Sequence, residues 1–181
     1  MPLFHTGPFG RADELRQGVA LSYEVSDDGM TYIINLDPKA IFTDGSPVTA
    51  QDVKDTFEYG AWPENQVSWG AVLLHTRDIK GITDVESGET LTASGLTVID
   101  DHTIQIELAN YVAVFPLKLT IWMLGIINAK EAKTMSLEEW TAAPIGVGPF
   151  ATTYDADNDR GELVATSNWW REPARLEKVK V

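Results

Sequence analysis

The stretch FTDGSPVTAQDVKDTFEY, residues 42–59, limits what this chain can fold into more than any other part of the sequence. Asp44 and Gly45 form a strong turn signal, because glycine accepts a positive φ and an aspartate side chain can bond its own backbone. Thr49 is a good helix N-cap, and Asp52, three residues later, completes a capping box. The stretch therefore predicts the end of a strand, a tight turn and the start of a helix.

The predicted helix covers about residues 50–60, and Gly60 is expected to end it. Lys54, Asp55 and Glu58 are expected to lie away from its apolar face. Caps and turns of this kind rarely carry out chemistry, so we expect these residues to be scaffold. At helical spacing, the apolar face is made by Ala50, Val53, Phe57 and Ala61.

Alternation of apolar and polar residues predicts two β-hairpins. Residues 21–25 and 32–36 flank one turn that is rich in aspartate, and residues 96–99 and 102–108 flank another. Each hairpin is expected to have one apolar face. Further strands are expected towards the C-terminus, over residues 150–154, 162–166 and 178–181.

The remaining apolar segments are shorter and less regular. We expect a helix over residues 112–119 with Pro116 in its first turn, and a buried strand or extended segment over residues 121–127. Residues 79–85 fit either a helix or a strand. Short helices are expected over residues 71–74, 129–134 and 136–141.

The composition excludes several classes of partner and site. A net charge of −13 over 181 residues argues against a nucleic-acid or anionic-membrane surface, which would repel the chain. The absence of cysteine removes disulfides, thiolate metal sites and cysteine nucleophiles. No apolar run is long enough for a membrane span, and the first residues do not resemble a signal peptide. We therefore expect either a cytoplasmic chain or a piece cut from a longer exported protein.

Residues that could carry out chemistry are few. The histidines are His5, His75 and His102, and none has a partner two to four residues away. Residues 155–162, DADNDRGE, lack the glycine and glutamate of a calcium loop, so we expect a solvated hairpin loop there. No serine lies in a nucleophile elbow, and no lysine is set for a Schiff base. The sequence therefore predicts no catalytic residue, no metal and no cofactor.

Several motifs stand in a characteristic order. They are SYEVSDDGMTYIINL, FTDGSPVTAQDVKDTF, GLTVIDDHTIQIEL, YVAVFPLKL, INAKEA, GVGPF and NWWREPARLEKVKV. In this order and at this spacing they resemble the extracytoplasmic solute-binding proteins that serve ABC importers of oligopeptides, dipeptides and nickel, known as family 5. The three isolated histidines do not support the nickel branch. Residues 5–20 match the usual lead-in poorly, and Trp169-Trp170 stands where the family often has Tyr-Trp, which leaves the subfamily open.

The resemblance implies an α/β (mixed α+β) chain that is a fragment of a type II periplasmic-binding-protein-like fold. Members of the family have two lobes that close on a ligand, with a smaller domain inserted in the first lobe. Residues 1–146 resemble that inserted small domain, and residues 147–181 resemble the start of the return into the main first lobe. The Pro- and Gly-rich joint at residues 144–149 is the expected boundary.

The resemblance also implies a function. We expect a non-catalytic fragment of a receptor that captures a peptide or other small solute in the periplasm or another extracytoplasmic space and delivers it to an ABC transporter permease. Trp69 falls in the segment where the oligopeptide branch presents an aromatic side chain to the cleft, and Trp62 is a second candidate. The alternative for both tryptophans is packing within the domain. One alternative for the whole chain is a free-standing interaction module that self-associates through its exposed strands, and another is an enzyme.

Overall fold

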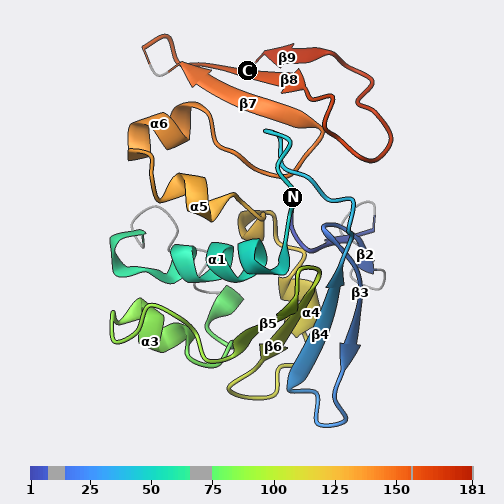
Figure 1. Ribbon diagram of the computed structural model, residues 1–181, viewed down its shortest axis with the longest axis vertical. Helices are drawn as coiled ribbons and strands as arrows, with labels where there is room; N and C mark the ends of the chain where they lie inside the picture. The colour runs from blue at the N-terminus through green and yellow to red at the C-terminus, as the bar shows by residue number, and fades with distance from the viewer. Residues whose placement is uncertain (8–14, 66–74, 156, 181) are drawn as a thin grey trace. The chain divides into compact units, whose positions relative to one another are not determined.

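The computed structural model describes residues 1–7, 15–65, 75–155 and 157–180 (Figure 1). Contacts divide the chain into two compact units. Unit 1 comprises Met1–Pro38 and Thr49–Ile126, and unit 2 comprises Lys39–Val48 and Ile127–Val181. Unit 1 holds β1 (Phe4–Thr6), β2 (Leu15–Gln17), β3 (Ala20–Val25), β4 (Thr31–Leu36), α1 (Ala50–Ala61), η2 (Pro63–Asn65), α3 (Ile82–Glu86), β5 (Leu96–Asp100), β6 (Thr103–Glu107), α4 (Phe115–Lys118) and η3 (Trp122–Leu124). Unit 2 holds α5 (Ala129–Ala132), α6 (Leu137–Ala142), β7 (Phe150–Asp155), β8 (Arg160–Ala165) and β9 (Lys178–Lys180).

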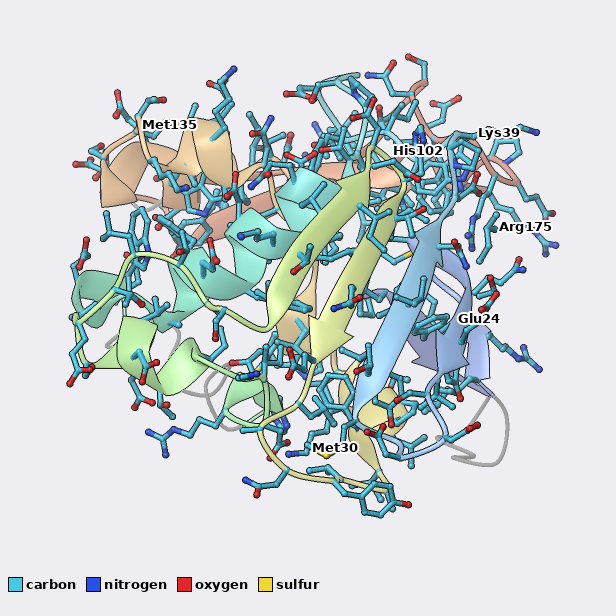
Figure 2. All side chains as sticks on the ribbon, turned by 60° about the horizontal axis from the view of Figure 1, so that its bottom comes forward. Glu24, Met30, Lys39, His102, Met135 and Arg175 are labelled. Carbon is cyan, nitrogen blue, oxygen red and sulfur yellow. The ribbon has the colours of Figure 1, made fainter. Side chains whose placement is uncertain are left out.

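The main sheet of unit 1 is antiparallel, with strand order β3-β4-β6-β5. Both predicted hairpins are confirmed, and the pairing of β4 with β6 joins them into one sheet. Met30 lies at the end of the sheet where β3 turns into β4, and His102 lies at the opposite end, in the turn between β5 and β6 (Figure 2). His102 is therefore a rim residue of the sheet.

Helix α1 covers the inner face of this sheet, packing against β5, β6 and α3 (Figure 1). The predicted capping box is present: the Asp52 amide donates to Thr49 Oγ1 at 3.4 Å, and the Thr49 amide donates to Asp52 Oδ2 at 2.7 Å. The apolar stripe is also confirmed, because all four of its residues are buried. The inward-facing residues of the central strands, Ile34, Ile104 and Ile106, are also fully buried.

Two details of the α1 prediction are wrong. The helix does not stop at Gly60 but continues to Ala61, and the Trp62 amide bonds back to the carbonyls of Glu58 and Tyr59. Gly60 is buried inside the helix, so its small size suits packing there. Glu58 was expected away from the apolar face but is only 4% exposed. Its side chain turns inward because it has a polar partner there, which is described below.

Several shorter elements also differ from the sequence prediction. Residues 121–127 form no continuous strand, because the 3-10 turn η3 interrupts them and leaves Trp122 80% exposed. The rest of the segment fits the extended alternative in part, since Ile121 is extended and Leu124, Ile126 and Ile127 are buried. Helix α4 keeps Pro116 in its first turn but is shorter than predicted. In the ambiguous segment, Ile79 bridges to Leu108 and the helix α3 follows. The helix expected at residues 71–74 lies outside the described part of the chain.

The sheet of unit 2 confirms the three predicted C-terminal strands, in the order β7-β8-β9. Period-two alternation gives it one charged face and one apolar face. No residue of these three strands is fully buried, in contrast to β4 and β6 of unit 1. Register places on the apolar face Phe150, Thr152, Tyr154, Leu163, Ala165 and Val179.

Among the described residues, none of the helices has the length and apolar character needed to span a bilayer. The assignment of residues 1–146 to an inserted domain and of residues 147–181 to the main lobe stays a prediction, because it concerns correspondence with whole relatives.

Candidate functional site

Trp62 is the predicted ligand-contact residue that the structure describes, whereas Trp69 lies outside the described residues. Trp62 is the C-cap of α1 and is half-buried. Its indole Nε1–H donates to the Leu91 carbonyl at 3.4 Å. Its ring centroid lies 5.7 Å from that of Tyr59, with 57° between the ring planes. The structure thus gives Trp62 local packing partners, and its role as a ligand contact stays a prediction.

The Leu91 carbonyl belongs to the irregular segment between α3 and β5. Glu58 Oε1 of α1 accepts a hydrogen bond of 2.8 Å from the Ala93 amide in this segment. Lys54, one helical turn earlier, lies 3.8 Å from the same carboxylate oxygen and donates to the Leu96 carbonyl at 3.0 Å. A buried carboxylate is costly unless it is paired and hydrogen-bonded, and here it is both. Helix α1 therefore holds the segment through Glu58 and Lys54.

Tyr59 and Leu91 lie next to Trp62, through a ring contact and a hydrogen bond respectively. Leu91 is 74% exposed beside the indole. Burial, followed by the nearby Glu64 carboxylate, raises the pKa of Tyr59, so its phenol is neutral at physiological pH. Aromatic rings with polar tips are the usual walls of sites that hold small organic ligands. The patch of Tyr59, Trp62 and Leu91 can contact a ligand, but it contains no nucleophile, acid or base.

Some titratable groups elsewhere in unit 1 form ion pairs, among them Lys118 with Asp78. His75 lies near the ion pair of Lys118 and Asp78. Burial, and then Lys118, lowers the pKa of His75, while Asp78 opposes this shift. The imidazole is therefore neutral at physiological pH. Across the parts of the chain that the structure covers, no three His, Asp or Glu side chains gather closely enough to hold a metal ion.

Unit 2 brings together motifs that are far apart in the sequence. The Asn168 side chain donates to the Thr43 carbonyl at 3.2 Å, which joins NWW to FTDG. The Thr43 amide donates to the Gly146 carbonyl at 2.9 Å, which joins FTDG to GVGPF. Gly146 also bridges to Ile127, at the start of INAKEA. Parts of four of the motifs are therefore joined in unit 2.

The last motif also contains an aromatic pair. The ring centroids of Trp169 and Trp170 lie 4.5 Å apart, and the Arg171 guanidinium lies 5.4 Å from the centroid of Trp170. The Trp169 indole donates to the Glu172 carbonyl at 3.0 Å. These local contacts fold the motif on itself, and they form no constellation that could catalyse a reaction.

Sequence reasoning missed Glu58 and Leu91. The Lys54–Glu58 spacing of four residues was a visible signal, but such pairs usually lie on the solvent face of a helix. Nothing in the sequence of the segment after α3 showed that its backbone would return to α1. Tertiary hydrogen bonds of this kind leave no local pattern.

Comparison with known proteins identifies the protein family that this chain resembles. The family model for bacterial extracellular solute-binding proteins, family 5 Middle, matches residues 14–181. The oligopeptide-binding protein OppA of Bacillus subtilis (strain 168) is 26% identical over 172 residues, which cover 92% of this chain and 31% of that protein. The periplasmic oligopeptide-binding protein OppA of Escherichia coli (strain K12) is 34% identical over 125 residues, or 68% of this chain and 22% of that protein.

A crystal structure agrees with these sequence relatives. It is that of the substrate-binding domain of an oligopeptide ABC transporter from Bacillus anthracis str. Ames, which matches with a TM-score of 0.84 at 22% identity, over 99% of this chain and 34% of that chain. This likeness confirms the predicted mixed α+β fold of periplasmic binding proteins. The chain spans about a third or less of the length of these proteins. The family match over nearly all of its residues shows that this chain belongs to family 5 of the bacterial extracellular solute-binding proteins.

Proposed function

We propose that this chain forms part of the non-catalytic ligand-binding wall of a peptide receptor that serves an ABC importer. The family match over residues 14–181 is the observation that carries the proposal. It is supported by the names of the relatives from Bacillus subtilis and Escherichia coli, both of which are oligopeptide-binding proteins. The receptor would work outside the cytoplasmic membrane and hand its ligand to the importer's permease.

In this proposal the wall acts by contact alone. A receptor with two lobes holds a peptide through backbone hydrogen bonds and accommodates its side chains in roomy pockets, and hinge closure then encloses the ligand. Trp62 and Trp69 would supply aromatic surface to the ligand. Residues 1–146 would be the inserted small domain, and residues 147–181 would lead back into the main lobe.

The chain should bind peptides weakly by itself. It spans only 22–31% of the two curated relatives, so it would enclose a ligand from one side only. The apolar face of the β7-β8-β9 sheet fits this view, since no residue of its strands is fully buried by the chain's own packing. We therefore expect a dissociation constant of about 1 mM, which corresponds to a binding free energy of roughly −4.1 kcal/mol.

Calorimetry with tri- to pentapeptides tests the proposal. We expect weak heats without saturation at micromolar concentration, and mass spectrometry should recover the peptides intact. Tight micromolar binding would contradict the one-sided wall, and hydrolysed peptide would show that the chain is an enzyme.

A second candidate function is self-association as an interaction module. The observation that favours it is the half-exposed apolar face of the β7-β8-β9 sheet, where Tyr154 is 38% exposed. Edge strands of such a sheet can pair with another chain. Sedimentation velocity discriminates between the two candidates: a clean monomer at the highest soluble concentration removes this second candidate, whereas a dimer supports it.

A further inference from the structure

The segment that reaches from α3 to β5 is held firmly at its two ends. At one end, the amides of Glu89 and Thr90 donate to the Asp84 carbonyl at 2.9 and 3.2 Å. At the other end, the Ala93 amide donates to Glu58 Oε1 at 2.8 Å, and the Gly95 amide donates to the Lys80 carbonyl at 2.8 Å. Ala93 is also buried, at 2% exposure. The second anchor is therefore buried, whereas the first anchor is held by backbone hydrogen bonds at the surface, where Asp84, Glu89 and Thr90 are exposed.

The middle of the segment, residues 91–92, is exposed. We call these two residues the strap. Thr90 Oγ1, at the first anchor, donates to the Thr92 carbonyl at 3.0 Å. Leu91 carries an apolar side chain that is 74% exposed. The strap meets α1 at the bond from the Trp62 indole to the Leu91 carbonyl, which at 3.4 Å is longer than an ordinary N–H···O bond. A chain with strong ends and a weakly bound middle opens locally before its anchors do.

We propose that the strap opens and closes over Trp62 while its two ends hold, and that Glu58 is the positioning residue that sets its closed state. With the strap closed, the indole N–H of Trp62 donates to Leu91. With the strap open, that N–H becomes available to another acceptor. The use of this donor by a peptide carbonyl rests on the proposed function above, whereas the motion itself does not.

Glu58 suits this role because it holds the second anchor of the strap through the Ala93 amide. Its carboxylate is 4% exposed, and Lys54 offsets its charge, so it keeps a fixed position. Glu58→Ala removes the acceptor of the Ala93 amide, and a buried amide without its hydrogen bond is costly. The strap would then lose the end that orients Leu91 towards Trp62.

Amide hydrogen exchange followed by NMR tests the proposal in the full chain. In the wild type, the amides of Leu91 and Thr92 should exchange at least tenfold faster than those of Ala93 and Gly95. Glu58→Ala should speed the exchange of Ala93 by about ten- to hundredfold. The same variant should shift the indole N–H resonance of Trp62, which is assigned by its loss in Trp62→Phe.

Two variants control the experiment. Glu58→Gln keeps an oxygen acceptor and should retain most of the protection of Ala93. Glu24→Gln removes an exposed carboxylate from β3 and should change neither readout. If Glu58→Ala does not fold, Trp62→Phe still tests the strap, because losing the indole donor should shift the carbonyl carbon resonance of Leu91 and leave the exchange of the Ala93 amide unchanged.

Equal exchange rates at Leu91 and Ala93 in the wild type would overturn the proposal. A Trp62 indole N–H resonance that does not shift in Glu58→Ala would also overturn it. A failure to bind peptide leaves both of these readouts intact, so it counts against the proposed function and not against the strap.

Discussion

The side-chain amide of Asn168 donates a hydrogen bond of 3.2 Å to the backbone carbonyl of Thr43, a residue 125 positions earlier in the chain. Both residues belong to unit 2, although most of the sequence between them folds into unit 1. This bond ties the two segments of unit 2 to each other. It makes the turn at residues 43–46 a structural joint, which accounts for the definite turn signals there.

Asn168→Ala should destabilise the chain. A half-buried Thr43 carbonyl would lose its donor, and such losses cost about 1–2 kcal/mol of unfolding free energy. Urea unfolding measures the difference. Asn158→Ala is the control, because Asn158 lies in the exposed β7–β8 turn and bonds only locally to Asp155; its effect should stay within about 0.5 kcal/mol. Equal stability of Asn168→Ala and wild type would contradict the role of the joint.

Gly45→Ala should also destabilise the chain. Gly45 has a φ of +91°, and an added Cβ would lie 3.1 Å from Asn168 Nδ2. An alanine at such a φ costs about 1 kcal/mol or more. Gly148→Ala is the matched control, since a Cβ at Gly148 meets nothing within 4 Å and its φ is not positive. Thermal unfolding should separate the two variants, and an equally stable Gly45→Ala protein would refute this account of the turn.

Local signals made most of the fold predictable. Thr49 and Asp52 predicted the start of α1, and strict alternation predicted β4 and β6, because in each case neighbouring residues make the structure. The failures have another cause. Trp122 lies in an apolar run that reads as a buried strand, yet a 3-10 turn exposes it. Local hydrophobicity does not show whether a partner strand is present to accept the segment.

The candidate site was much less predictable. Glu58 reads as a solvent-facing residue because it follows Lys54 by four positions, and only the return of Ala93 to α1 turns it inward. The contact of Trp62 with Leu91 likewise depends on chain path. Such contacts depend on tertiary structure, so no local pattern encodes them.

Phe57→Ala should cause the largest loss of stability among single changes in α1. Phe57 is fully buried between the helix and the sheet of unit 1. Truncation leaves a cavity, and such changes cost about 3–5 kcal/mol. Chemical denaturation followed by circular dichroism gives the value. Leu91→Ala, at a side chain that is 74% exposed, should cost under about 0.5 kcal/mol. Comparable losses in the two variants would mean that α1 does not form the core.

Ser26→Ala should raise the pKa of Asp28. The Ser26 hydroxyl donates to Asp28 Oδ1 at 2.5 Å and is the main cause of the lowered pKa of that carboxyl, followed by the Met30 amide. The pKa of Asp28 in the folded chain is below its ordinary value of about 3.9, so the ionised carboxylate stabilises the fold. This stabilisation is present above about pH 4 and is lost as the pH falls through the folded-state pKa.

An NMR titration of the side-chain carboxyl carbons checks this prediction. Asp100 provides an internal control, since its pKa is lowered mainly by the His102 amide, which the mutation leaves in place. In Ser26→Ala the pKa of Asp28 should rise, and the pKa of Asp100 should stay the same. Parallel movement of both residues would indicate a general change of fold rather than the loss of one hydrogen bond.

The central claim is that this chain contacts peptides without transforming them. Its most direct test is a titration of the isotopically labelled chain with tri- to pentapeptides at millimolar concentration, followed through the indole N–H resonances of its six tryptophans. We expect saturable shifts at Trp62 or Trp69, none at the exposed Trp122, and unchanged peptide resonances throughout. Tryptophan resonances that stay fixed at every peptide concentration, or peptides that are cleaved during the titration, would contradict the claim.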